Sequence, residues 1–413
     1  MVLSLQAQSA LYAAFDVYPS AKGAATHIQQ AARTLFDTAG GGLLYVQGHP
    51  SLPRYQREGN VEILRSGRLA DNYLYRALHF GGELDDVLAG GLRDSLRIAQ
   101  FRDPWSGAAI LNHAAGRFVT VYEVNGLPSI ELPVAYPEIG AATLAKIRAL
   151  EDDCLAGADR IVVPSAVIRD NLMQRAIDPR RVEVIANGTE LIEPSPHPAP
   201  TLGRYLLYFG APQSWQGLDV LLRAWARMRD LPDLHLVICC SVRSRRAKAY
   251  RKLAERLEIA DRIYWEFGLS RDALEPWVSN AYLTLAPLTE CARNLDQGCC
   301  PLKILESMGA GVPVVASDLP VVQELVAHRH NGYLVRPGRP AELARAIRVL
   351  LEFPQTVAAM GREAQQTIRD GFLWSHANAR LQALHRDLLE VDRNDQAILT
   401  GQTGRGLSEA VQS

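Results

Sequence analysis

Residues 297–318 read QGCCPLKILESMGAGVPVVASD, and the order of residue types in this stretch predicts a loop, a short helix and a buried strand. Pro301 suits the first position of a helix, because the N–H group that proline lacks would have no partner there. Apolar residues between 302 and 308 recur on one helical face. Gly309 and Gly311 predict the end of the helix, and the apolar run after them predicts a strand.

The loop before this helix predicts a binding site for an anion. Gly298, Cys299 and Cys300 place backbone N–H groups at a helix N-terminus, just ahead of Leu302. Such a terminus holds phosphate well. Glu306 lies one turn into the helix, where a carboxylate can accept hydrogen bonds from sugar hydroxyls. This pattern fits a nucleotide whose diphosphate and ribose lie along the helix.

Length and composition indicate a globular protein with two large domains. The chain has 413 residues, of which 48% are hydrophobic and 22% charged, and a domain usually holds about 100–200 residues. The formal net charge of −1 argues against a nucleic-acid partner. The six cysteines show no Cys-x-x-Cys pair and no zinc spacing with histidine, so we expect reduced thiols and no metal site.

The hydropathy pattern predicts a cytoplasmic protein. The first ten residues lack the basic and apolar regions of a signal peptide. No run approaches the roughly 18 apolar residues of a transmembrane helix. A basic run at residues 241–252 is typical of a solvated helix face, and its alternative is contact with phosphate or peripheral contact with the inner face of an anionic membrane.

Short strands and helices alternate along most of the chain, which predicts parallel sheets covered by helices on both faces. The stretch 191–202 is rich in proline and is typical of a linker. We therefore expect an α/β protein with two Rossmann-like doubly wound domains, 1–195 and 203–375, facing a central cleft. Residues 376–393 predict a helix that packs back on the first domain, and the polar tail 394–413 predicts disorder.

Two parts of the first domain have less regular patterns. Residues 47–73 are polar and rich in loop-forming types, so we expect no regular structure there. Residues 72–95 have a helical pattern, in which Gly81 and Gly82 predict a break.

The segment around Glu306 resembles the donor-binding motif of retaining glycosyltransferases of family 4, which have the GT-B fold. In that family two glutamates stand eight positions apart. Glu306 matches the second, which is expected to bind the ribose, whereas Gly298 stands at the place of the first, which normally touches the donor sugar. The resemblance implies that Lys303 compensates in part by reaching the diphosphate. The alternative is that Lys303 forms a surface ion pair with Glu306.

The resemblance extends to the first loop of the second domain. Gly210 begins this loop and Gln213 lies within it, and in the family the loop supplies an arginine and a lysine to the diphosphate. Ala211 and Gln216 stand at those places here. The resemblance therefore implies that Arg293, together with the lysine of the motif, replaces the two missing cations.

In the first domain, Gly23 and Ala24 resemble the family's glycine-rich first loop, which approaches the phosphates from across the cleft. Asn125 stands where the family often has a histidine, and with Asp103 it is expected to shape the acceptor side. Plain turn or loop chemistry is the alternative for each of these residues.

Two smaller matches concern the hinge between the domains. Asn187-Gly188 matches an Asn-Gly pair at the family's hinge, and Ser165 matches a serine at a strand end. A turn would select Asn-Gly equally well. We interpret His27 as a residue of a helix face rather than a catalytic one.

The resemblance covers nearly the whole chain and implies a retaining hexosyltransferase. Such an enzyme takes a sugar from a nucleoside diphosphate sugar, UDP- or GDP-linked, without a cofactor or metal. Its acceptor would be a glycan, a lipid-linked sugar or a small molecule, as in polysaccharide biosynthesis. Two alternatives stay open: a related GT-B phosphorylase or epimerase, and a non-catalytic GT-B protein that binds a nucleotide sugar or a partner.

Overall fold

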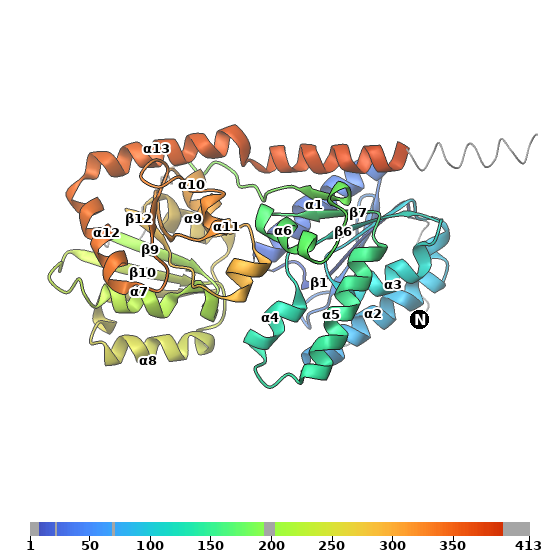
Figure 1. The fold of residues 1–413 in the computed structure, drawn as a ribbon, viewed down its shortest axis with the longest axis horizontal. Helices are drawn as coiled ribbons and strands as arrows, with labels where there is room; N and C mark the ends of the chain where they lie inside the picture. Colours follow the sequence, from blue (N-terminus) through green and yellow to red (C-terminus); the bar gives the residue numbers. More distant parts are fainter. Residues whose placement is uncertain (1–7, 21–22, 68–70, 194–202, 391–413) are drawn as a thin grey trace, which may run out of the picture.

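The computed structural model describes residues 8–20, 23–67, 71–193 and 203–390, which form two α/β domains side by side (Figure 1). Each domain contains one sheet with helices packed against it. The sheet of the first domain has eight strands in the order β3-β4-β2-β1-β5-β6-β7-β8, and the sheet of the second has six in the order β11-β10-β9-β12-β13-β14. The structure confirms the two Rossmann-like domains and the GT-B architecture.

All strand pairs of the first domain are parallel except β3 with β4. Its strands are β1 (Ala10–Val17), β2 (Gly42–Gln47), β3 (Tyr55–Glu58), β4 (Val61–Ser66), β5 (Ile98–Phe101), β6 (Val119–Glu123), β7 (Arg160–Val163) and β8 (Val182–Val184). Its helices are α1 (Gly23–Ala39), α2 (Tyr73–Ala89), α3 (Pro104–Ala114), α4 (Pro128–Ala135), α5 (Ala141–Gly157) and α6 (Ala166–Gln174).

The sheet of the second domain is parallel throughout. Its strands are β9 (Arg204–Gly210), β10 (Leu234–Cys240), β11 (Ile263–Phe267), β12 (Leu283–Ala286), β13 (Val314–Ser317) and β14 (Tyr333–Val335). Its helices are α7 (Leu218–Trp225), α8 (Lys248–Arg256), α9 (Arg271–Ser279), α10 (Leu302–Gly309), α11 (Pro320–Gln323), α12 (Pro340–Glu352) and α13 (Pro354–Gly371). The central strands are buried on both faces, which explains their continuous apolar sequence.

The two irregular parts of the first domain differ from the sequence prediction. Residues 55–66 form the hairpin β3–β4 at the sheet edge, and its charged residues hide the alternation that marks a strand. Helix α2 continues through Gly81 without a break. A side chain at position 81 would meet the carbonyl oxygen of Trp105 at 2.8 Å, so the glycine allows α2 to approach the start of α3.

A helix at residues 374–390 follows α13 and crosses back to the first domain (Figure 1). Leu381, Leu384 and Leu388 of this helix are buried in one cluster with Tyr12 and Ile28 of the first domain. Burial of each such side chain contributes about 1.5–3 kcal/mol. The helix therefore couples the end of the chain to the first domain. The predicted tail 394–413 and most of the predicted linker lie outside the described residues.

A π-helical turn of the second domain, η6 (Arg293–Gln297), contacts the first domain through its side chains. The Nε atom of Arg293 lies 3.1 Å from Glu131 Oε1 of α4. The side chain of Gln297 is buried; it accepts a hydrogen bond from Leu127 N at 3.0 Å and donates one to Glu131 at 2.9 Å. Glu324 adds a second link, because its carboxylate accepts from the backbone N–H groups of the first turn of α6. These contacts hold the loop before α10 against the first domain.

Candidate functional site

A cleft of about 1930 Å³ lies between the domains. Its walls are the loops that follow β1, β5 and β6 in the first domain and β9, β10 and β11 in the second, so the carboxyl ends of the strands face it. Ligands of doubly wound sheets bind at this edge. Of the predicted site residues, the cleft is lined by Gly23, Ala24, Asp103, Asn125, Gly210, Gln213, Arg293, Cys299, Cys300, Leu302, Lys303 and Glu306.

The start of α10 presents free backbone N–H groups to this cleft. Helix α10 begins at Leu302, and Pro301 precedes it in an extended conformation with ψ of 104°, so proline lies one position earlier than predicted. Within the described ranges, no acceptor contacts the N–H groups of Cys299, Cys300, Leu302 or Lys303. Unpaired N–H groups at a helix N-terminus attract an anion.

Lys303 is the unpartnered cation of this site. Its Nζ atom is buried, has no hydrogen-bond acceptor among the described residues and lies 4.3 Å from the centre of the Tyr208 ring. Burial lowers the pKa of Lys303 to about 7, and the nearby Glu306 carboxylate opposes that shift. Gly210 borders the amine closely, because a side chain there would meet Lys303 Nζ at 3.4 Å. The predicted surface ion pair is wrong, and the amine is available to a phosphate.

Glu306 lies one turn beyond Lys303 on the same side of α10 and lines the cleft. Burial raises the pKa of Glu306 to about 7, against the opposing charges of Arg271 and Lys303. A carboxyl group with a raised pKa beside a cation with a lowered pKa is typical of a functional site. No ion pair joins the two side chains in the described part of the chain, so both keep hydrogen-bonding capacity for a ligand.

Gly298 does not line the cleft, which corrects its assignment to the donor site. Its backbone has φ of 87° and ψ of 172°, a region that is essentially reserved for glycine. A Cβ atom at this position would lie 2.9 Å from Val167 Cβ and 3.0 Å from Ser165 Oγ. The glycine therefore allows close contact with the first turn of α6, and a glutamate would be strained in this conformation.

Replacing Gly298 by glutamate, as the family pattern would have it, is expected to destabilise the protein. The positive φ alone should cost about 1–3 kcal/mol, and the contact with α6 adds to that loss. Denaturant unfolding measures the change. Gly338→Ala is the matched control, because Gly338 also has a positive φ of 66° but has nothing within 4 Å of its Cβ direction. A Gly298→Glu protein as stable as wild type would show that the domain contact is not needed.

The other predicted cations of the donor side are placed differently. Arg293 lies 3.1 Å from Glu131 and 5.1 Å from the centre of the Trp215 ring, so its charge already has a partner across the domain interface. Ala211 and Gln216 line the cleft and supply no charge. Arg271 lines the cleft beside Glu306 and was missed, because nothing in its sequence surroundings marks it.

The first domain approaches α10 through the start of α1. A Cβ atom on Gly23 would lie 2.9 Å from Leu302 Cδ1, so the glycine permits close contact with the donor helix. Ala24 follows it in the cleft wall. The two positions therefore lie opposite α10, where the sequence predicted them.

Asp103 has a structural role that the sequence did not indicate. One carboxylate oxygen accepts from Ser106 N at 2.8 Å and caps α3, and the other accepts from Phe15 N at 2.7 Å. Burial raises the pKa of Asp103 to about 6, and these hydrogen bonds oppose the shift. With both oxygens engaged, the carboxylate joins β1 to the start of α3. Asn125 lines the cleft, and its amide donates to Glu123.

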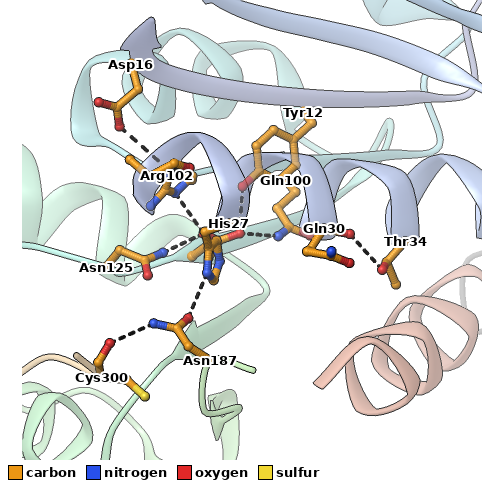
Figure 2. A network of polar contacts seen from close by, with 12 residues as sticks. Tyr12, Asp16, His27, Gln30, Thr34, Gln100, Arg102, Asn125, Asn187 and Cys300 are labelled. Carbon is orange, nitrogen blue, oxygen red and sulfur yellow. Dashed lines mark hydrogen bonds and ion pairs between the residues drawn. The ribbon is translucent and has the colours of Figure 1, made fainter. Parts of the chain in front are cut away.

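A network of polar side chains borders the cleft (Figure 2). The sequence did not predict it. Its centre is Glu123 at the end of β6, which is 2% exposed. Arg102 Nε and His27 Nε2 each lie 2.8 Å from Glu123 Oε1. His27 also lies 2.8 Å from Asn187. His27 lies on a face of α1, as interpreted, and the sequence did not show that this face is turned toward Glu123 of β6 and Asn187.

Close packing, rather than a turn, explains the glycine of the hinge pair Asn187-Gly188. Gly188 has no positive φ. A side chain on Gly188 would lie 2.4 Å from Trp374 N, so the glycine allows the two connections between the domains to cross closely. Ser165 caps α6 by accepting a hydrogen bond from Ile168 N at 3.3 Å.

Two general properties of the described residues complete the picture. They contain no group of three or more His, Cys, Asp or Glu side chains arranged to hold a metal ion. Among the same residues, no helix has the length and apolar character needed to cross a membrane.

Comparison with known proteins relates this arrangement to transferases. Residues 203–352 match the family model described as glycosyl transferases group 1. The chain is 30% identical over 295 residues to D-inositol 3-phosphate glycosyltransferase 1 of Catenulispora acidiphila, a match that covers 66% of this chain and 68% of that protein. It is 25% identical over 226 residues to the MMP alpha-(1->4)-mannosyltransferase of Mycolicibacterium hassiacum, over 54% of this chain and 53% of the relative.

Solved structures share the fold over nearly the whole chain. Sucrose-phosphate synthase from Thermosynechococcus elongatus superposes with a TM-score of 0.78 at 18% identity and covers 93% of this chain and 100% of its own. Anabaena Alr3699/HepE in complex with UDP-glucose has a TM-score of 0.70 at 17% identity and covers 92% of this chain and 100% of its own. With two facing Rossmann-like domains, a family match over the second domain and the Catenulispora relative at 30% identity, the chain belongs to the group 1 glycosyl transferases.

Proposed function

We propose that this protein is a retaining glycosyltransferase of family 4 that moves a hexose from a nucleoside diphosphate sugar to a hydroxyl group of an acceptor. The observation that carries the proposal is the buried, unpartnered Nζ atom of Lys303 beside Glu306 at the N-terminus of α10. An amine without an acceptor and several free N–H groups suit two phosphates. The carboxylate one turn further suits the hydroxyls of a ribose.

In this proposal the chain's residues act by positioning and by charge. Lys303 and the N–H groups of Cys299 and Cys300 face the oxygens of the diphosphate, on which negative charge accumulates as the sugar departs. Preorganised donors aimed at a developing charge accelerate a reaction more than donors that must first reorient. Glu306 holds the ribose and so fixes the position of the leaving group.

The acceptor side of the cleft suits an uncharged, hydroxyl-bearing molecule such as a glycan. Tyr73 and Trp105 line it with ring centres 6.3 Å apart, and the carboxylates of Asp16 and Glu131 lie in the same wall. Aromatic faces pack against sugar rings, and carboxylates accept hydrogen bonds from hydroxyls. The described cations of this wall already contact Glu123. We therefore expect this acceptor to differ from the phosphate-bearing inositol named for the Catenulispora relative.

The donor site can be tested by thermal unfolding with a panel of nucleoside diphosphates. UDP and GDP are the first choices, since UDP is bound by the HepE structure. A ligand at a hundredfold excess over Kd stabilises the folded state by about 2.7 kcal/mol. We expect one diphosphate to raise the melting temperature of wild type and of Glu352→Ala, an exposed control, but not of Glu306→Ala. Equal shifts in all three proteins would remove Glu306 from the site.

Turnover separates the transferase from the alternatives. With the donor sugar identified, we expect release of the diphosphate to depend on an acceptor, with neutral disaccharides and simple hexosides more active than inositol 3-phosphate. The product should keep the anomeric configuration of the donor, which NMR of the new linkage shows directly. Binding without turnover with any acceptor would favour the non-catalytic GT-B protein, and release of sugar phosphate would favour a phosphorylase.

A further inference from the structure

Asn187 connects the hinge to the donor loop, and its orientation is determined by its partners. Its Nδ2 atom lies 2.9 Å from the carbonyl oxygen of Cys300, the residue that precedes Pro301 and α10. A carbonyl oxygen can only accept, so the amino group of Asn187 must face Cys300. The Oδ1 atom of Asn187 then faces His27, whose Nδ1 atom lies 2.8 Å away. Since Oδ1 only accepts, Nδ1 of His27 carries a proton.

The second nitrogen of His27 faces an acceptor as well (Figure 2). Its Nε2 atom lies 2.8 Å from Glu123 Oε1. The carboxylate of Glu123 also receives hydrogen bonds from Tyr12 OH at 2.8 Å and Gln100 Nε2 at 2.7 Å, and it pairs with Arg102 at 2.8 Å. Surrounded by donors, this carboxyl group has no acceptor for a proton of its own. Nε2 of His27 therefore donates too.

Each ring nitrogen of His27 thus faces an acceptor, and the neighbouring His385 shows the contrast. His385 donates from Nε2 to Gln100 Oε1 at 2.7 Å, and its Nδ1 atom has no partner. Burial lowers the pKa of His385 to about 3, so this ring is neutral. One network therefore contains a histidine on α1 with an acceptor at both ring nitrogens and a histidine on the helix at 374–390 with an acceptor at only one.

We propose that His27 is a positioning residue for the nucleotide-sugar donor: as an imidazolium it holds Asn187, and Asn187 holds the carbonyl of Cys300 in the donor loop. His27, Asn187 and Cys300 all line the cleft. The chain of hydrogen bonds fixes the peptide on one side of the free N–H groups that start α10. This inference rests on the proposed donor site.

Substitution separates the positioning role from a structural one. The glutamine of His27→Gln can donate a hydrogen bond to Asn187 or to Glu123 but not to both, so one of the two hydrogen bonds is lost. Asn187→Asp still accepts from the imidazolium but turns a carboxylate oxygen toward the Cys300 carbonyl. We expect each variant to raise the KM for the donor about tenfold, the usual value of a charge-assisted hydrogen bond, while kcat changes less. His330→Gln, with an exposed ring, is the matched control and should keep the wild-type KM.

Nitrogen-15 NMR of histidine-labelled protein tests the protonation without any ligand. We expect both ring nitrogens of one histidine to show attached protons at neutral pH, and this signal to vanish in His27→Gln. The inference is overturned if His27 is a neutral tautomer, or if either variant keeps the wild-type donor KM after correct folding is shown by thermal unfolding. Failure of wild type to bind any nucleotide would instead overturn the proposed function, and the NMR result would still decide the state of the network.

Discussion

Lys303→Met should abolish most of the transferase activity and at the same time stabilise the ligand-free protein. Loss of one donor aimed at a developing charge costs about 10²–10³ in kcat, and among the described residues that line the cleft Lys303 is the one lysine. Methionine has nearly the length of lysine, but it removes a buried amine without an acceptor. Burying such a group unpaired costs about 1–3 kcal/mol, and that cost disappears in the variant.

The pH dependence of stability gives an independent measure of the same amine. Burial lowers the folded-state pKa of Lys303 to about 7, below the ordinary lysine value of 10.5. Between these values the unfolded chain binds more protons, so the free energy of unfolding should rise with pH across this window. Lys303→Met should lack that rise. Lys252→Met, an exposed lysine on α8, is the control for both measurements. Wild-type turnover in Lys303→Met, or a loss of stability, would contradict the assigned site.

Glu123→Gln should destabilise the first domain strongly although it changes the shape of the side chain little. Glu123 is the counter-charge for Arg102 and His27, and its own side chain is 3% exposed. Removing one partner of a buried ion pair costs about 3–5 kcal/mol, because the remaining charge is buried without compensation. Denaturant unfolding at neutral pH measures the loss.

An exposed ion pair provides the control for this variant. Glu183 pairs with Arg380 at 3.3 Å with 36% of its side chain exposed, and such pairs contribute about 0–1 kcal/mol. Glu183→Gln should therefore be nearly neutral. Burial alone would raise the pKa of Glu123, but His27 and Arg102 lower it to about 2 from the ordinary glutamate value of 4.5. Its stabilisation should be complete above pH 4.5 and be lost as the pH falls toward 2, and Glu123→Gln should flatten this acid limb. A Glu123→Gln protein as stable as Glu183→Gln would contradict the network.

The donor side of the site was predictable because its signals are local. The Gly-Cys-Cys-Pro loop, the apolar face of α10 and the spacing from Lys303 to Glu306 lie within a dozen residues, and helix geometry alone places the last two on one side. The loops at Gly23 and Gly210 follow strands, so a parallel sheet brings them to the same edge.

The acceptor side and the network around Glu123 were not predictable in this way. Arg102 stands 21 residues from Glu123, and His27 stands 160 residues from Asn187, and no local pattern records such pairings. Gly298 illustrates the same limit: in the sequence it is a missing glutamate, whereas in the structure its backbone and its contact with α6 exclude one.

The sequence by itself determined the alternation of strands and helices, the two domains and the helix that carries Lys303 and Glu306, because periodicity, caps and turns act within a few residues. Only the tertiary structure decided that Lys303 has no hydrogen-bond acceptor among the described residues, that Arg293 is engaged by Glu131, and that His27 lies between Glu123 and Asn187. These properties depend on burial and on partners that other elements supply, and both arise only when the two sheets are assembled around the cleft.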